Sequence, residues 1–263
     1  MATIEAKGLA KAFPAAGGGH LYALREVDFF IGDGEFVCLL GPSGCGKSTL
    51  LNIVSRLDTA YQGSVLFDGL SLRELDSREG PRVGYLFQES RLLPWRTVRG
   101  NIEFALESEG IPKTRWREVL ATHLRLVGLE GFADYYPYQL SGGMQQRVAV
   151  ARAFAVDPDV LLMDEPFNAL DEITARRMRR ELLSIWSCYR KTVLFVTHNA
   201  FEATYLADRI LVMTRCPGAI YREVSVALPR PRSYDDPDLF RLTAELVRDF
   251  LAHIGEDERP ATT

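Results

Sequence analysis

The sequence feature that most constrains the fold is a glycine-rich loop between a strand and a helix. The run EFVCLL (35–40) is continuously apolar, as expected for a strand covered on both faces of a sheet. It leads directly into GPSGCGKST (41–49), and KSTLLNIVSRL (47–57) then has helical periodicity. Strand, glycine loop and helix in this order predict a phosphate-binding loop, in which backbone N–H groups surround the phosphates. Lys47 is expected to reach the β- and γ-phosphates, and the Ser48 hydroxyl to bind Mg²⁺.

Strands and helices alternate along most of the chain, which predicts an α/β fold with a parallel sheet. Between about 97 and 153 the pattern changes to amphipathic helices, so we expect a helical subdomain inserted between strands of one sheet. The predicted domain is 1–230, with a core of about 1–96 and 154–230 around that subdomain. Residues 231–263 are expected to form a linker, a helix over 239–251 and a tail. Further strands are expected in the apolar runs 4–13, 22–31, 63–70, 82–88, 160–165, 192–198 and 210–214.

Composition and cysteine spacing exclude several classes of protein. The net charge of −4 does not suit a general nucleic-acid binder, so no nucleic-acid partner is expected. The four cysteines show neither CxxC pairs nor metal-ligand spacing, which is typical of a reducing cytosol. We expect Cys45 to be a small side chain that fills space within the loop. Its position in the loop also predicts that it reacts with thiol reagents. MATIEAKGLAKAF (1–13) is too polar for a signal peptide, and no apolar run approaches the roughly 18 residues that span a bilayer.

Two carboxylates close another apolar strand. VLLMDE (160–165) ends in Asp164 and Glu165, whose side chains point to opposite sides because neighbours alternate along a strand. Asp164 suits a Mg²⁺ shell, and Glu165 could polarise a water aimed at the γ-phosphate. Gln88 and His198 each lie at the end of an apolar strand. Because the carboxyl ends of parallel strands converge on the ligand crevice, both are expected to point toward a nucleotide.

Six motifs occur in the order seen in the ATP-binding subunits of ABC transporters. They are GPSGCGKST, Gln88, LSGGMQQR (140–147), VLLMDEP (160–166), NALD (168–171) and His198. The resemblance covers about residues 4–228 and makes 1–230 an ABC ATP-binding domain. It implies a P-loop NTPase (RecA-like) parallel-sheet core, an N-terminal antiparallel β subdomain and the inserted α-helical subdomain. It also implies an ATPase with ATP and Mg²⁺ as cofactors.

The resemblance implies roles for individual residues. Glu165 is the catalytic base, His198 contacts the γ-phosphate, and Gln88 contacts Mg²⁺ and senses the attacking water. The metal shell comprises Ser48, Gln88 and Asp164. The expected nucleotide-binding residues are Phe13, Gly41, Pro42, Ser43, Gly44, Cys45, Gly46, Lys47, Ser48, Thr49, Ser141, Gly142, Gly143, Gln145 and Asp171. Among these, Phe13 is expected to stack on adenine, with Tyr22 as the alternative, and Asp171 lies in a loop that communicates across a dimer.

LSGGMQQR would be a second anion-binding helix start in the same chain. One nucleotide does not need two such loops from one molecule. We therefore expect Ser141 and Gly143 to serve the ATP of a second copy, in an ATP-sandwich dimer whose closure and reopening follow ATP binding and hydrolysis.

Three stretches resemble importer subunits. LLPWRTVRGNI (92–102) resembles part of the groove that receives a short helix from the membrane subunit. Pro94 and Trp95 would be apolar anchors there, unless Trp95 is a core residue. FADYYPYQLSGGMQQR (132–147) and MTRCPGAIYREVSVALPRPR (213–232) resemble the nitrate, sulfonate, taurine and bicarbonate importer group. The expected partners are two integral membrane permease subunits and, indirectly, a periplasmic or extracellular solute-binding protein. The chain would be peripheral, on the cytoplasmic face of the inner membrane.

Several alternatives stay open. The chain could serve an importer for another small solute, or be a soluble ABC ATPase without a transport role. A phosphotransferase with the helical subdomain as a lid is a third possibility. Asn168 and Asn199 depart from the family pattern, and these departures bear on coupling strength and turnover rate and not on the reaction class. The helix over 239–251 is expected to pack on the core, with a regulatory or dimer-contact role as the alternative.

Overall fold

A computed structural model of the chain describes residues 2–15, 18–75, 80–168 and 170–256. Ala169 of the NALD motif and the tail 257–263 lie outside the described residues. The chain forms two compact units. The terminal unit consists of residues 2–80 and 192–263, and the middle unit of residues 81–191.

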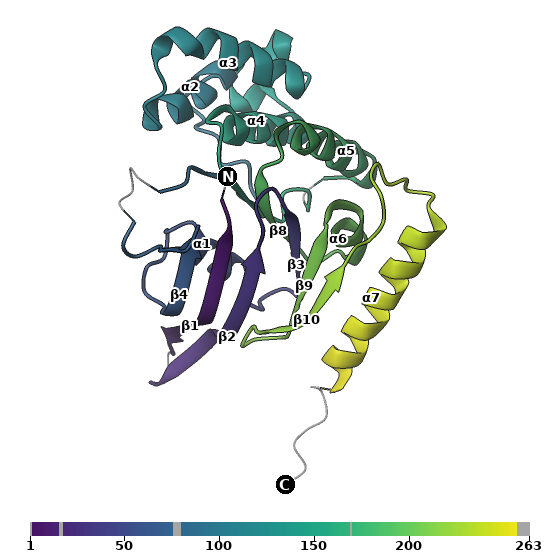
Figure 1. The fold of residues 1–263 in the computed structure, drawn as a ribbon. Coiled ribbons are helices and arrows are strands. Elements are labelled where there is room, and N and C mark those ends of the chain that lie inside the picture. Colours follow the sequence, from purple (N-terminus) through teal and green to yellow (C-terminus); the bar gives the residue numbers. More distant parts are fainter. Residues whose placement is uncertain (1, 16–17, 76–79, 169, 257–263) are drawn as a thin grey trace. The chain divides into compact units, whose positions relative to one another are not determined.

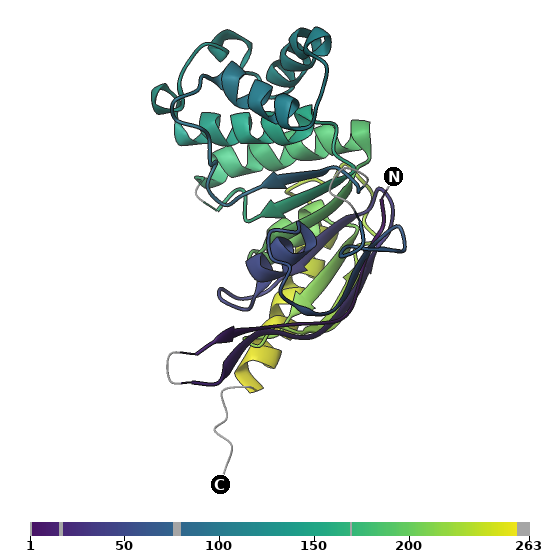
Figure 2. The same cartoon turned by 90° about the vertical axis from the view of Figure 1, so that its left-hand side faces the viewer.

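The terminal unit contains an antiparallel sheet with the strand order β2-β1-β4-β5. Its strands are β1 (Ile4–Pro14), β2 (His20–Ile31), β4 (Gln62–Phe67) and β5 (Leu70–Ser71). Burial alternates along much of β1 and β2, but it is interrupted at residues 7–8 and 25–26, where the pairing of the two strands shifts in register. The two strands form a long hairpin, seen as the purple ribbon in Figure 2.

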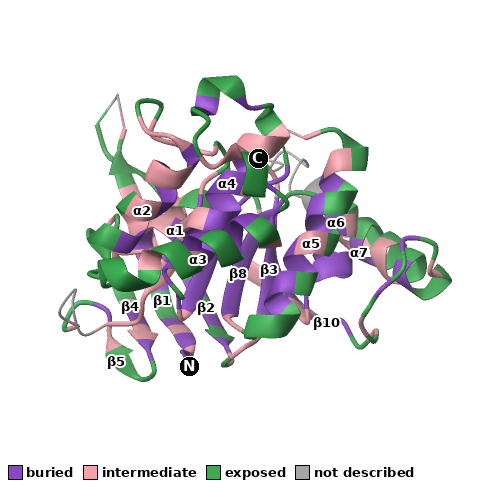
Figure 3. Cartoon of the chain, turned by 90° about the horizontal axis from the view of Figure 1, so that it is seen from above, coloured by how far each residue is buried: buried purple, intermediate pink, exposed green. Residues whose placement is uncertain are grey.

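The terminal unit also contributes four strands of a second sheet in the order β10-β9-β3-β8. They are β3 (Phe36–Leu40), β8 (Thr192–Thr197), β9 (Arg209–Met213) and β10 (Ile220–Ser225). β3 runs parallel to both β8 and β9, and all residues of β3 and β8 are buried. Figure 3 shows these two strands as continuous purple. β10 was not predicted, because this antiparallel edge strand is only partly buried and its apolar residues do not alternate regularly.

In its described part, the terminal unit also contains the helices α1 (Lys47–Val54), α6 (Ala200–Leu206) and α7 (Pro237–Glu256). α7 packs on α6, where the Thr204 and Thr243 hydroxyls lie 2.7 Å apart and the Phe201 and Phe240 rings 5.7 Å apart (Figure 1). The helix begins and ends beyond the predicted 239–251. The residues before it are not a free linker, because Tyr234 is buried against Tyr205 with ring centroids 4.5 Å apart.

The middle unit is mostly helical. Its parallel strands are β6 (Val83–Leu86) and β7 (Val160–Asp164). Its helices are α2 (Val98–Ser108), α3 (Lys113–Leu126), η1 (Glu130–Phe132), η2 (Pro137–Gln139), α4 (Gly142–Ala155) and α5 (Glu172–Tyr189). α4 packs beside α2 and α3 (Figure 1). It also contacts β6, and these contacts explain why its sequence is apolar on most sides.

The predicted α/β fold is thus confirmed, with parallel strands in both units. Helices α2 and α3 lie within the stretch predicted to be helical, and α4 begins in it and ends at Ala155. Among the described residues, none of the helices is both long and apolar enough to span a membrane.

Candidate functional site

The glycine loop connects β3 to α1 in the terminal unit, as its sequence predicts. Gly46, at φ 98°, precedes the first residue of α1, and Gly44 has φ 80°. These left-handed conformations favour glycine over every residue with a Cβ. Lys47 is buried, and its Nζ donates to the carbonyl oxygens of Gly41 at 2.9 Å and Pro42 at 2.8 Å. The lysine therefore lies folded across its own loop.

The two sides of this loop differ in exposure. Ser43, Gly44 and Ser48 are exposed, whereas Cys45 is buried. Burial raises the pKa of the Cys45 thiol, although Lys47 opposes the shift. Because the thiolate is the reactive form, the structure contradicts the expected reactivity of Cys45 and supports its expected role as a filler.

His198 is exposed and directly follows β8. The next residue, Asn199, caps α6, because its Oδ1 accepts a hydrogen bond from the Glu202 amide at 3.1 Å. Asn and Asp cap helices about equally well. The departure at Asn199 therefore leaves the start of α6 intact.

Both candidates for adenine stacking lie on the β1–β2 hairpin. Phe13 is 41% exposed, and the Lys11 ammonium lies 4.9 Å from its ring centre. Lys11 is itself buried and is held by Asp58 at 2.7 Å and by the Ala60 carbonyl at 2.7 Å. Tyr22 is 37% exposed and lies under the Arg25 guanidinium. Each ring thus has a cation on one face, an arrangement that stabilises the ring position.

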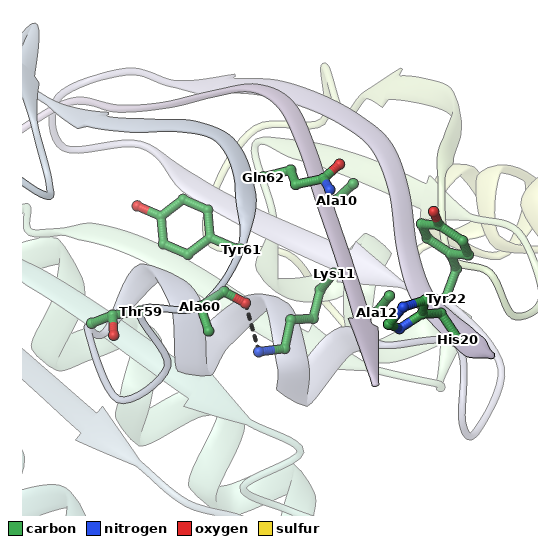
Figure 4. A pocket seen from close by; sticks show the side chains of 9 residues that line it. All are labelled: Ala10, Lys11, Ala12, His20, Tyr22, Thr59, Ala60, Tyr61 and Gln62. Carbon is green, nitrogen blue, oxygen red and sulfur yellow. Dashed lines mark hydrogen bonds between the residues drawn. The ribbon is translucent and has the colours of Figure 1, made fainter. Parts of the chain in front are cut away.

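A cavity of about 370 Å³ lies beside the hairpin (Figure 4). Lys11, His20, Tyr22, Tyr61 and Gln62 are among its lining residues. The Lys11 side chain lines it and points toward the Ala60 carbonyl. Tyr22 therefore lines a cavity, whereas Phe13 is next to Lys11 outside that lining.

In the middle unit, the two carboxylates lie at the end of β7. Asp164 is the last residue of the strand and is buried, and Glu165 is half-buried. Glu165 has φ 43°, a left-handed conformation that is uncommon for a residue other than glycine. Its carbonyl accepts a hydrogen bond from the Asn168 amide at 3.2 Å. Strain of this kind concentrates at functional sites, and the turn into NALD stabilises it here.

The pKa of Tyr85, on the neighbouring strand β6, is affected by the charge of Asp164. Burial raises the pKa of its phenol, and the Asp164 carboxylate raises it further. Both effects disfavour a second negative charge beside Asp164.

Gln88 is exposed, two residues beyond β6. The segment that follows it is attached to α4, because the Arg152 guanidinium donates to the Ser90 carbonyl at 3.0 Å and to the Arg91 carbonyl at 2.9 Å. The Ser90 hydroxyl also lies 3.4 Å from Gln145 Oε1. The Gln88 segment and the start of α4 are therefore linked within one unit.

The LSGGM segment forms the start of α4. Ser141 caps this helix by accepting from the Met144 amide at 3.3 Å, and Gly142 is exposed with no neighbouring atom where a Cβ would stand. Gln145 lies one turn further, where its Nε2 donates to the Pro137 carbonyl at 3.0 Å and to that of Leu140 at 3.3 Å. Its described contacts are thus internal to the unit.

Asp171 lies close to LSGGM. It caps α5 by accepting from the Thr174 amide at 3.0 Å, and this hydrogen bonding lowers its carboxyl pKa. A Cβ built on Gly143 would stand 3.3 Å from Thr174 Cγ2. The middle unit thus brings together two capped helix starts, those of α4 and α5.

Pro94 and Trp95 are both exposed, Trp95 at 72%. The alternative of a core tryptophan is therefore wrong. The buried Asn101 accepts from the Leu93 amide at 2.7 Å and donates to the carbonyls of Leu93, Arg96 and Thr97. This amide fixes the loop that presents the two apolar side chains.

Sequence reasoning missed the role of LPRPR (228–232). The buried Arg232 guanidinium donates to the carbonyls of Thr204, Tyr205 and Ala207 at the end of α6. Arg230 likewise donates to the Leu206 carbonyl. Burial lowers the pKa of Arg232 to about 10. These arginines satisfy the last carbonyls of a helix, and the only signal in the sequence is the repeated Pro-Arg pair.

The predicted site residues divide between the units. The phosphate loop, Phe13 and His198 belong to the terminal unit, and Gln88, Asp164, Glu165, LSGGM and Asp171 belong to the middle unit.

Comparisons with known proteins agree with these motifs. The family profile described as ABC transporter matches residues 24–168. An uncharacterised ABC transporter ATP-binding protein of Methanocaldococcus jannaschii is 49% identical over 82% of this chain and 79% of its own length. The nitrate import ATP-binding protein NrtD of Synechococcus elongatus is 43% identical over 92% of this chain and 88% of that protein. The aliphatic sulfonates import ATP-binding protein SsuB of Bacillus cereus is 39% identical over 88% of this chain and 90% of that protein.

Solved structures are similar as well. A dimeric post-hydrolysis state of the ATP-binding cassette MJ0796, bound to ADP and Pi, has a TM-score of 0.75 and 34% sequence identity. It covers 86% of this chain and 100% of the cassette.

Proposed function

This chain belongs to the ABC transporter family and is an ATP-binding, ATP-hydrolysing subunit, and on that basis we propose a transport role for it. In this role the chain powers an importer for a small anion and works as one half of a dimer. The observation that carries the proposal is the identity of about two residues in five, over most of the chain, to ATP-binding proteins named for nitrate and aliphatic sulfonate import. Taurine and bicarbonate belong to the same substrate class. The transported anion would be bound by partner proteins.

ATP binding would begin at the exposed side of the phosphate loop. Backbone N–H groups of the loop would surround the phosphates, and Lys47 would exchange the carbonyls of Gly41 and Pro42 for phosphate oxygens. The carbonyl contacts support this, because they hold the ammonium at the loop before any ligand arrives.

The oxygen donors of Ser48, Gln88 and Asp164 suit Mg²⁺, which prefers hard oxygen ligands. Ser48 is exposed beside the loop, and Asp164 is a buried carboxylate whose charge raises the pKa of Tyr85. The residues present thus fit the ion. When bound, Mg²⁺ would neutralise part of the phosphate charge.

Hydrolysis would use Glu165 as the base. Its carboxylate would accept a proton from water as the water oxygen attacks the γ-phosphorus and the bond to ADP breaks. His198 would contact the γ-phosphate and Gln88 the attacking water. The left-handed backbone at Glu165 supports this role, because strained conformations of this kind cluster at functional sites.

LSGGM would complete the ATP site of the partner subunit. Ser141 and Gly142 are exposed at the start of a fourteen-residue helix, where N–H groups and the helix dipole attract anions. Asp171 lies in the adjacent capped turn and would carry the signal between the two copies. ATP would hold the dimer closed, and loss of the γ-phosphate would let it open.

Two membrane permease subunits would be driven by this cycle, and a solute-binding protein would deliver the anion to them. Pro94 and Trp95 would anchor a short helix of a permease subunit, since they expose apolar surface on a rigid loop next to the Gln88 segment. The chain would thus be peripheral, on the cytoplasmic face of the membrane.

Purification of the tagged chain from detergent-solubilised membranes of its native cell tests this function. We expect two integral membrane proteins to co-purify, and the assembled complex to release bound anion that can be identified by mass spectrometry. Trp95→Ala should lose the membrane proteins while keeping ATP hydrolysis. Full cellular activity of the chain without any membrane subunit would favour the soluble ABC ATPase instead. A phosphorylated product without free phosphate would favour a phosphotransferase.

A further inference from the structure

The turn between β9 and β10 contacts the phosphate loop. Thr214–Ala219 connects β9 to β10, and Gly218 within it is buried although its neighbours Cys216 and Pro217 are exposed. A Cβ built on Gly218 would stand 2.0 Å from the Cys45 carbonyl oxygen, where real Cβ contacts are never below 3.0 Å. The φ of Gly218 is not positive, so glycine is required here by space and not by backbone conformation.

The turn is held firmly at that position. The Gly218 amide donates to the Ala23 carbonyl at 2.9 Å, and the Gly218 carbonyl accepts from the Arg25 amide at 3.0 Å. Within the turn, the Thr214 hydroxyl oxygen accepts from the Ala219 amide at 2.9 Å and lies 3.0 Å from the Pro217 carbonyl oxygen. These hydrogen bonds tie the turn to β2 and leave it little freedom to retreat from the loop.

The phosphate loop also contacts the same strand, β2. A Cβ on Gly46 would stand 2.6 Å from the Ala23 carbonyl oxygen, and a Cβ on Gly41 would stand 2.7 Å from Cys45 Sγ. The Ala23 peptide therefore contacts both the turn and the loop. The turn and β2 thus hold the loop backbone at Cys45 and Gly46, whereas Ser43 and Ser48 of the same loop are exposed.

We propose that Gly218 is a positioning residue for the phosphate loop, one that fixes the Cys45 peptide so that the loop N–H groups are arranged for a triphosphate before it binds. The proposal rests on ATP being the ligand of this loop. A side chain at position 218 would push the Cys45 carbonyl outward and tilt the peptides that follow it. Recognition of phosphates should then weaken, whereas stacking of the base on the β1–β2 hairpin should not.

The test compares the full-length chain with Gly218→Ala and with Gly131→Ala as the control. Gly131 also has an ordinary φ, and no atom lies within 4 Å of a Cβ built on it. Calorimetry should show that Gly218→Ala weakens binding of both Mg-ATP and inorganic tripolyphosphate by about tenfold or more, because sub-ångström misplacement of a preorganised site is costly. The ratio of the two affinities should stay at the wild-type value, and Gly131→Ala should bind both as the wild type does.

A folded Gly218→Ala variant with wild-type affinity for tripolyphosphate would overturn the proposal, as would a change confined to Mg-ATP. If circular dichroism shows that this variant is unfolded, Thr214→Val decides the matter. It removes the hydroxyl that holds the turn and should weaken both ligands by a common factor of about two to five. Unchanged affinities in Thr214→Val would then refute the proposal. A wild-type chain that binds neither ligand would instead refute ATP binding itself.

Discussion

At the scale of single residues, burial decides which cysteine can react. Cys38 and Cys45 are buried and burial raises the pKa of both thiols, whereas Cys188 and Cys216 are exposed. A raised pKa means less thiolate at any given pH, and hence slower alkylation. We expect a thiol reagent at neutral pH to modify Cys188 and Cys216 alone, as read by mass spectrometry of the native chain. In denaturant the reagent should also modify Cys38 and Cys45. Rapid labelling of Cys45 in the native chain would contradict the structure.

A second residue-scale question is which ring stacks on adenine. We expect Phe13→Ala to weaken Mg-ATP binding by about tenfold, since stacking of one base on an aromatic ring contributes about 1–3 kcal/mol. Tripolyphosphate affinity should not change, because the phosphate loop is untouched. Tyr22→Ala is the matched variant on the paired strand and should bind Mg-ATP nearly as the wild type does. If calorimetry instead shows that Tyr22→Ala weakens Mg-ATP binding and Phe13→Ala does not, the adenine base stacks on Tyr22 and occupies the cavity that Tyr22 lines.

At the scale of elements, Arg232 determines how the chain after β10 is attached. Its guanidinium donates to three carbonyls at the end of α6 from a buried position. Hydrogen bonds from charged groups contribute about 1.5–3 kcal/mol each, and the buried carbonyls would lose their partner. The cost of burying the Arg232 guanidinium, which lowers its pKa, offsets part of that sum. We expect Arg232→Met to lower the free energy of unfolding in urea by about 2–4 kcal/mol. The exposed Arg241→Met on α7 should change it by less than about 0.5 kcal/mol. Equal losses in the two variants would exclude this capping role.

The elements also show which features a sequence can predict. Gly44 and Gly46 adopt positive φ within the motif that requires it, and Ser141 and Asp171 each cap a helix through an amide three residues away. Such features depend on a few neighbouring residues, and so do continuously apolar strands such as β3 and β8.

Features that depend on distant segments were not predictable in this way. The contact of Gly218 with Cys45 and the hydrogen bonds of Arg232 to α6 join distant segments, and neither segment's own sequence identifies its partner. β10 was not predicted for a related reason. This edge strand is held by pairing with β9 and is only partly buried, so its sequence lacks a clear apolar pattern. The residues expected to bind ATP were identified from local motifs, whereas the residues that support them from behind were not.

At the scale of the whole molecule, the proposed dimer makes hydrolysis and subunit separation one event. Glu165→Gln removes the base but keeps the shape and the hydrogen-bonding capacity of the side chain. We expect turnover to fall by about 10²–10⁴-fold, the contribution typical of a general base. ATP should then persist between phosphate loop and partner LSGGM, so that the variant elutes as a dimer in size-exclusion chromatography with ATP and as a monomer without it.

Two further variants make this outcome specific. Glu245→Gln, the same change at an exposed position of α7, should hydrolyse ATP normally and show no trapped dimer. Adding Gly142→Trp to Glu165→Gln should abolish the dimer while each chain still binds ATP at its own loop, because Gly142 lies at the exposed start of α4 where a bulky side chain would block a partner's phosphates. Normal hydrolysis by Glu165→Gln would remove Glu165 from the role of base. A trapped dimer that tolerates tryptophan at position 142 would instead remove LSGGM from the interface and leave the base assignment standing.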